Sequence, residues 1–228
     1  MTHTARYHPE FILLQEFVQG SLPMGINVAV SSHVEACLVC DQKVDKLLKE
    51  AGDNWQQHDA IEYTDDLTFI ADNILNDDAL PIQSSISSSA AREVQIAGRA
   101  VRLPQLLADI YSVGLTWKTV AKGIQQALID LDSQTVSKFV YMEPGSRVPR
   151  HSHMGNEFML VLEGTLSDEF GDYQELDFVA RDPQDTHAQT TENGCVCLFI
   201  TDAPLRFSDG LLRLMNPINS LQMWLKRR

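Results

Sequence analysis

The stretch GSRVPRHSHMGNEFMLVLEG, residues 145–164, decides the fold of this chain. Successive side chains on a β-strand point to opposite faces, so His151 and His153 lie on one face. Glu157 follows after a short turn and points inward from the next strand. Two neutral imidazoles and a carboxylate suit a first-row divalent metal ion. The stretch therefore predicts two adjoining strands that carry ligands of one metal site, the alternative being that both histidines are exposed on a polar strand.

The spacing of these residues resembles the first motif of the cupin barrel, G-x5-H-x-H-x3-E-x6-G, without a mismatch. A second cupin motif usually supplies one more histidine, and DPQDTH, residues 182–187, is its counterpart. It departs from the common form, because Asp185 replaces a glycine and the spacing to His187 is one residue shorter. The resemblance implies that a divalent metal ion, expected to be zinc with iron, manganese or nickel as alternatives, is held by His151, His153, Glu157 and His187.

Short runs rich in β-branched and aromatic residues surround this motif. They cover residues 139–142, 157–163, 176–180 and 195–200, and glycine, proline, asparagine and aspartate lie between them. Several short strands at such spacing predict an antiparallel sandwich or barrel. We therefore expect residues 101–228 to form a cupin-like domain, an antiparallel jelly-roll.

Residues 1–80 show helical periodicity instead. Apolar residues recur at helical spacing over residues 9–19, and further helices are expected over residues 24–37, from about residue 44 to Gly52, and over residues 66–75. Residues 81–100 are rich in serine and read as a flexible linker, or else as a surface loop of one continuous domain. The sequence thus predicts an α+β protein of two domains, a small helical bundle followed by a β-barrel.

A second set of candidate ligands lies in the helical half. His33 and Cys37 are four residues apart, so they share a face if both are helical, and Cys40 follows one turn later. One imidazole and two thiolates favour zinc, which takes four ligands in structural sites. His8 is the first candidate for the fourth ligand, ahead of His3, His58 and Glu35. The alternative is that both cysteines are small core residues.

Composition excludes several functions. The 228 residues include 18 Lys and Arg against 31 Asp and Glu, which gives a net charge of −13. Such a chain is a poor match for nucleic acid and suits a partner with a basic surface. We see no apolar run long enough for a membrane span and no secretory signal at the N-terminus, so we expect a cytoplasmic protein with no membrane partner.

His8 followed 25 residues later by HxxxCxxC resembles the zinc-binding anti-sigma domain. Together with the cupin motif and the stretch GCVCLFITDAPLRF, residues 194–207, the chain resembles the ChrR-type anti-sigma factors over nearly its whole length. The resemblance implies that His8, His33, Cys37 and Cys40 bind zinc. It also implies that the helical domain binds an extracytoplasmic-function sigma factor and releases it on a singlet-oxygen-like oxidative signal, for which the cupin domain is needed.

Two other functions remain open at this point. A metal-dependent cupin enzyme, of the dioxygenase or isomerase class, would use the same three histidines and glutamate. A storage or binding module would use the barrel but leaves the HxxxCxxC pattern unexplained. Cys195 and Cys197 alternate on one strand face and are either redox-active thiols or small core residues. The sequence predicts no catalytic residue and no oligomeric state.

Overall fold

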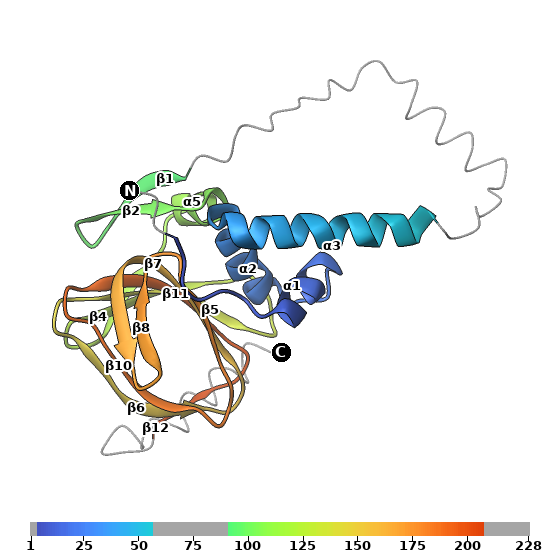
Figure 1. Cartoon of the computed structure of the whole chain (residues 1–228). Coiled ribbons are helices and arrows are strands. Elements are labelled where there is room, and N and C mark those ends of the chain that lie inside the picture. Colours follow the sequence, from blue (N-terminus) through green and yellow to red (C-terminus); the bar gives the residue numbers. More distant parts are fainter. Residues whose placement is uncertain (1–3, 57–90, 208–228) are drawn as a thin grey trace.

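The computed structural model describes residues 4–56 and 91–207 (Figure 1). The helix expected over residues 66–75 therefore lies outside the described residues. No helix in the described part has the length and apolar character needed to cross a membrane. The helices are α1 (Phe11–Val18), α2 (Met24–Ala36), α3 (Leu38–Gln56) and α5 (Gln105–Ser112). The strands are β1 (Arg92–Ile96), β2 (Arg99–Leu103), β3 (Trp117–Ala121), β4 (Ile124–Ile129), β5 (Val136–Met142), β6 (Arg147–His153), β7 (Glu157–Asp168), β8 (Gly171–Gln174), β9 (Phe178–Arg181), β10 (Thr186–Thr190), β11 (Cys195–Thr201) and β12 (Leu205–Phe207).

The first two helices confirm the periodicity of the sequence. α1 begins two residues after its expected start and ends one residue early, and α2 begins at the expected residue and ends one residue early. Pro23 is the N-cap of α2, where a residue without an N–H group leaves no helical hydrogen bond unmade. The third helix was expected to end at Gly52, and this was wrong because it continues to Gln56. A glycine inside a helix costs only about 1 kcal/mol, which one turn of regular hydrogen bonding outweighs.

Residues 92–103 form a hairpin in which β1 pairs antiparallel with β2. The prediction of a flexible linker is therefore wrong for residues 92–100, while residues 81–90 lie outside the described part. Alternation explains the hairpin, because Val94, Ile96, Val101 and Leu103 fall on one face and three of them are buried. The turn between the strands has positive φ at Ala97 and Gly98, as two-residue hairpin loops require.

The remaining ten strands form one curled antiparallel sheet, which confirms the predicted cupin-like fold. Its order is β12-β6-β10-β7-β11-β5-β4-β3, with β8 and β9 also paired to β7 (Figure 1). The register places His187 of β10 opposite His151 of β6 and places Glu157 at the start of β7. The curl of the sheet therefore brings the predicted cupin residues to one side of its concave face.

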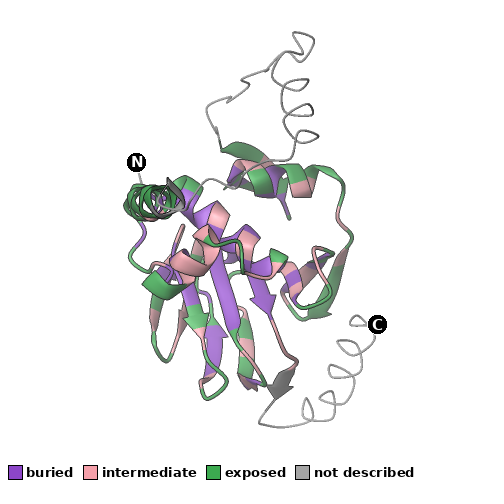
Figure 2. Cartoon of the chain, turned by 90° about the vertical axis from the view of Figure 1, so that its right-hand side faces the viewer, coloured by how far each residue is buried: buried purple, intermediate pink, exposed green. Residues whose placement is uncertain are grey.

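Alternation along the central strands β5, β7 and β11 divides the core into two clusters. Figure 2 shows that buried residues lie on the strands and on the helices that face them. The inward-facing cluster fills the barrel. It includes Val140, Met142, Met159, Val161, Cys195, Cys197 and Phe199. The outward-facing cluster packs against the helices. It includes Phe139, Leu160, Leu162, Val196, Leu198 and Ile200 from the sheet and Leu14, Val28, Val30, Cys37 and Cys40 from the helical half. The helical half thus lies on the outer face of the sheet and shares one hydrophobic core with it.

Polar contacts also stabilise the interface between α2 and the sheet. The backbone N–H of Gly25, in the first turn of α2, donates to Asp132 Oδ2 at 2.7 Å. A Cβ atom at this glycine would lie 2.3 Å from Thr135 Oγ1 and 2.5 Å from Ser137 Oγ. Only a residue without a side chain allows α2 to approach the sheet this closely.

Candidate metal centres

The first candidate centre brings together the four residues that the resemblance implied in the helical half. His8 Nδ1 lies 3.3 Å from His33 Nε2, 3.4 Å from Cys37 Sγ and 3.5 Å from Cys40 Sγ. Ligand atoms at metal distances of about 2.0–2.3 Å in a tetrahedron lie about 3.3–3.8 Å apart. One donor atom of each residue lies within 4.8 Å of all the others. The arrangement therefore fits a single tetrahedral ion.

Three different pieces of chain position these donors. α2 ends at Ala36, and Cys37 is an extended residue between α2 and α3. The expectation that Cys37 shares a helix face with His33 is therefore wrong. Cys40 follows in the first turn of α3. His8 comes from the N-terminal segment, which is anchored on the sheet by a hydrogen bond from Phe178 N to Tyr7 O of 3.0 Å.

Glu35 takes no part in the first cluster. Its Oε1 accepts a hydrogen bond from Gln105 N at 2.8 Å, which ties α2 to the start of α5. His3 and His58, the other weaker candidates, lie outside the described residues.

Burial favours the uncharged forms of two donors of the first centre, His33 and Cys40. It lowers the pKa of His33 to about 4 and raises the pKa of Cys40 to about 12. His33 Nδ1 lies 2.8 Å from Leu176 O and donates to it, which leaves the Nε2 lone pair directed at the cluster. A buried set of two imidazoles and two thiols gains most from a cation that replaces the thiol protons.

The second candidate centre lies on the concave side of the curled sheet. It contains His151 and His153 of β6, Glu157 of β7 and His187 of β10, all buried. His153 Nε2 lies 3.0 Å from His187 Nε2, and both nitrogens lie 3.6 Å from Glu157 Oε1. These separations are those of neighbouring ligands on one divalent ion.

Hydrogen bonds orient two of these histidines from outside the cluster. His151 Nδ1 donates to Pro149 O at 2.8 Å, and His187 Nδ1 donates to Asp168 Oδ2 at 3.0 Å. Both bonds leave Nε2 unprotonated and directed inward, as outer-shell partners of metal-binding histidines do. Burial would raise the pKa of Asp168, but hydrogen bonds from His187 and Tyr173 reverse this and hold the pKa well below its usual range.

Burial also controls the protonation of the second centre. It lowers the pKa of His151 to about 4 and that of His153 to about 3, and it raises the pKa of Glu157 to about 7. Lys138, an inward-facing residue of β5, has a pKa lowered by burial and partly restored by Glu157. Lys138 and Asp168 had no signal in the sequence, since neither lies within a metal-binding motif.

Cys195 and Cys197 are buried on β11, where they face the barrel interior with Met142 and Met159. Contact with Cys195 and burial raise the pKa of Cys197 well above its usual value. A reactive cysteine requires a lowered pKa and solvent access. The placement favours small core residues over the redox role, which stays a prediction.

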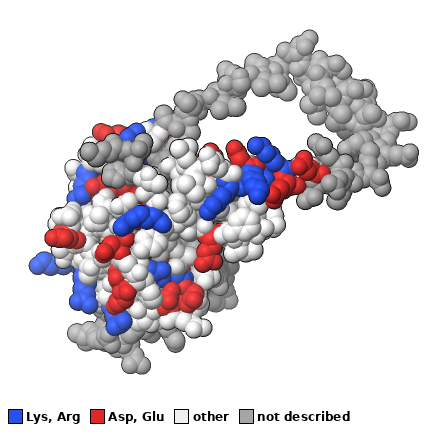
Figure 3. All heavy atoms as spheres, viewed as in Figure 1, with Lys and Arg blue, Asp and Glu red and all other residues white. Residues whose placement is uncertain are grey.

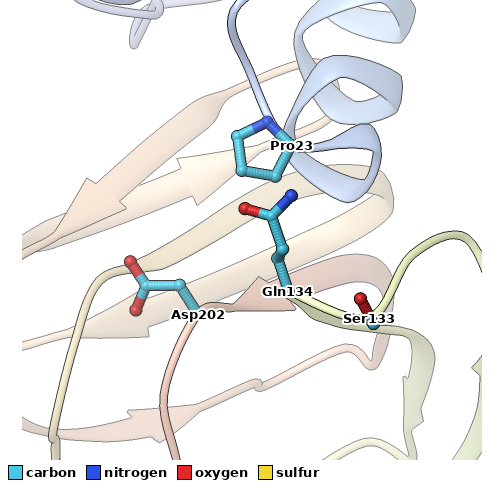
Figure 4. Close-up of a pocket in the computed structure, with 4 residues that line it drawn as sticks. All are labelled: Pro23, Ser133, Gln134 and Asp202. Carbon is cyan, nitrogen blue, oxygen red and sulfur yellow. The ribbon is translucent and has the colours of Figure 1, made fainter. Parts of the chain in front are cut away.

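A concavity of about 620 Å³ lies where the helical half meets the sheet (Figure 4). It is lined by Pro23 before α2, by Ser133 and Gln134 between β4 and β5, and by Asp202 after β11. None of the eight cluster residues lines it, so it is not part of either candidate centre.

The chelator-treated chain should lose stability as the pH falls from about 6.5 to 4. Three buried histidines have folded-state pKa values of about 4, 4 and 3. The unfolded chain therefore binds more protons in this window, and each histidine lowers the unfolding free energy by about 1.4 kcal/mol per pH unit. Glu157 raises the unfolding free energy as the pH falls from 7 to 4.5, because its folded-state pKa is about 7. This single group opposes three histidines, so the net effect remains a loss of stability. Urea unfolding across this pH range measures the slope, and a flat or rising stability would contradict it.

The comparisons with known proteins agree with this geometry. The model of the ChrR cupin-like domain family matches residues 110–205. The anti-sigma-E factor ChrR of Cereibacter sphaeroides is 28% identical over an alignment of 223 residues, which covers 94% of this chain and 98% of that protein. A crystal structure of Rhodobacter sphaeroides SigE in complex with the anti-sigma ChrR has a chain that matches with a TM-score of 0.71 at 22% identity, covering 87% of this chain and all of that one. Residues 110–205 thus match the model of the ChrR cupin-like domain family, and along almost its whole length the chain is similar to the anti-sigma-E factor ChrR.

Proposed function

We propose that the chain is an anti-sigma factor. Its helical half binds an extracytoplasmic-function sigma factor in the cytoplasm, and the cupin-like half releases that factor in response to an oxidant of the singlet-oxygen kind. The protein acts as a regulator rather than as an enzyme. The observation that carries this proposal is the similarity to an anti-sigma factor along both halves of the chain.

The helical half offers an apolar surface for such a partner. Phe11 and Ile12 of α1 are each 58% exposed, and Leu38 at the start of α3 is 78% exposed. Charged side chains of both signs lie along α3, beside uncharged surface (Figure 3). Exposed apolar side chains concentrated on one part of a protein favour an interaction site. The exposed apolar residues of α1 and α3 are candidate contacts for the partner, namely Phe11, Ile12, Leu38, Val39 and Leu48.

The donor sets indicate the metal of each centre. Two thiolates and two imidazoles in a closed tetrahedron favour structural zinc at His8, His33, Cys37 and Cys40. The ion would join the N-terminal segment, the end of α2 and the start of α3. Three imidazoles and one carboxylate at His151, His153, Glu157 and His187 accept zinc and also iron, manganese or nickel. A metal held there would supply the site at which an oxidant acts.

The same donor set supports a second candidate function, that of a metal-dependent cupin enzyme. Three histidines and a glutamate leave coordination positions for a substrate. Lys138 lies on the same side of β5 as the inward-facing Val140 and Met142. Metal analysis of protein purified without supplements separates the two functions. Iron at full occupancy would favour oxygen chemistry, whereas zinc in both centres favours the regulator.

The direct test is co-expression of the full chain with the extracytoplasmic-function sigma factor encoded beside it. We expect the two proteins to elute together and the purified chain to inhibit transcription by RNA polymerase carrying that sigma factor. Separate elution with no inhibition would overturn the proposal.

Replacing both Phe11 and Ile12 by serine should weaken sigma binding by at least ~10-fold, because buried apolar anchors dominate protein interfaces. Both side chains are exposed, so the fold should be unaffected. The matched control replaces Val120 and Leu128, which are exposed apolar residues of β3 and β4, and should leave binding unchanged. Titration calorimetry gives both affinities. Equal losses in the two double variants would place the partner elsewhere.

A further inference from the structure

One short stretch of the cupin-like half contacts both candidate centres. We name residues 168–178 the bridging segment; it contains β8 and the turn that leads into β9. At its first residue, Asp168 Oδ2 accepts the hydrogen bond from His187 Nδ1 at 3.0 Å. Asp168 Oδ1 accepts a hydrogen bond from Tyr173 Oη, within the same segment, at 2.6 Å. The position of Tyr173 is therefore tied to that of a donor of the second centre.

The other end of the bridging segment holds a donor of the first centre. Leu176 O accepts the hydrogen bond from His33 Nδ1 at 2.8 Å. Leu176 has φ +72°, a conformation uncommon for a residue other than glycine. It is kept there by a hydrogen bond from its own N–H to Val161 O at 2.9 Å. The carbonyl that orients His33 thus belongs to a backbone position that its surroundings must hold in place.

The bridging segment also holds the chain next to His8. The carboxylate of Asp177 is fully buried, and its Oδ1 accepts hydrogen bonds from Arg6 N at 2.6 Å and from Tyr7 N at 3.1 Å. The ring of Tyr7 lies against the ring of Tyr173, with centroids 5.1 Å apart. Two of the four donors of the first centre, His8 and His33, therefore depend on this segment for their position.

We propose that the bridging segment couples the two centres, so that a change at His187 alters how tightly the first centre holds its metal ion. If His187 moves, Asp168 loses a hydrogen-bond donor and its contact with Tyr173 rearranges. Tyr173 packs on Tyr7, the residue before His8. Mutation of residues that hydrogen-bond to metal ligands typically changes the metal affinity by about 10- to 100-fold. Asp168, Tyr173, Leu176 and Asp177 are positioning residues in this device.

Only the biological role of this coupling rests on the proposed function. It gives the route by which a signal at the cupin-like half reaches the helical half. Its physical content is a difference in metal retention, which is measured with no sigma factor present. Failure of the coupling and failure of sigma binding are therefore separate results.

The experiment uses the full chain loaded with cobalt(II), whose thiolate absorption band reports the centre that contains Cys37 and Cys40. The centre with three histidines and a glutamate has no sulfur ligand and cannot produce this band. Excess chelator is added and the decay of the band is followed. We expect His187→Gln to speed the decay by at least ~5-fold, the lower range of coupling between linked sites. Asp168→Asn keeps all eight donors and should also speed it, which preserves the test if His187→Gln does not fold.

The decisive comparison repeats His187→Gln in two backgrounds. Tyr173→Phe removes the hydrogen bond to Asp168 and should reduce the effect of His187→Gln to less than ~2-fold. Tyr111→Phe is the matched control, because it removes a tyrosine hydrogen bond to Gln95 O, outside the bridging segment, and should leave the effect intact. The proposal is overturned if His187→Gln and Asp168→Asn leave the decay unchanged, or if the effect is undiminished in the Tyr173→Phe background.

Discussion

Cys40→Ser is expected to remove one bound metal ion, lower Tm by several degrees and abolish sigma binding. Cys40 is fully buried, and its sulfur lies 3.5 Å from His8 Nδ1. Without the thiolate the ion loses one of four ligands, and the remaining donors stay buried with no cation. Metal binding in small zinc domains supplies folding free energy directly. The helices of this chain also pack on the sheet, so the loss is partial, and we expect about 3 kcal/mol or more, roughly 6–12 °C in Tm.

Cys197→Ser is the matched control for this variant. Cys197 is 1% exposed, so the same atom is replaced in a similarly buried environment, but it lies in the barrel core rather than in a cluster of donors. We expect a modest loss of stability from packing and no loss of metal. Elemental analysis and calorimetry of both variants give the comparison. Equal metal content in Cys40→Ser and the unaltered chain would contradict the first centre.

Gly164→Ala should destabilise the cupin-like half strongly, by about 3 kcal/mol or more. Gly164 has φ +80°, and a Cβ atom there would lie 2.2 Å from Gly194 O, a backbone atom that no side-chain rotation can move away. The residue lies opposite Cys195, at the end of the β7–β11 pairing. Insertion of a methyl group therefore separates two central strands of the sheet.

Gly52→Ala, in contrast to Gly164→Ala, should stabilise the chain. Gly52 lies within α3, its φ is ordinary, and a Cβ atom would meet nothing within 4 Å. Alanine there should stabilise the chain by about 0.5–1 kcal/mol, since glycine loses more freedom on folding. Guanidinium unfolding of both variants tests the pair. Similar midpoints for the two alanine variants would show that the close approach at Gly164 does not constrain the sheet.

The part of the site carried by local patterns could be predicted from the sequence. His151, His153 and Glu157 lie within seven residues on the consecutive strands β6 and β7, and alternation along β6 indicates the common side of the two histidines. His187 lies on a strand that pairs with β6, and here only the likeness to a known second motif pointed to it. His8 depended on resemblance still more, because a hydrogen bond between Tyr7 and Phe178, 171 residues apart, brings it to the cluster.

Other features lacked any signal in side-chain chemistry. The partner of His33 is the backbone carbonyl of Leu176. Every residue has such a carbonyl, so the sequence does not single out Leu176. The break after the second helix was expected at Cys37, but the start of α3 at Leu38, rather than near residue 44, was missed. The hairpin of residues 92–103 was hidden by the serine-rich stretch before it, although its own apolar residues alternate.

Leu14 and Val30 share one apolar cluster with Leu160 and Ile200, so the peptide chain between residues 57 and 90 is not what keeps the two halves together. A protease that cut this stretch would leave two fragments that still adhere. Cleavage there would therefore not liberate the helical fragment. Its departure requires that water enter the contact between α2 and the outer face of the central strands β7 and β11.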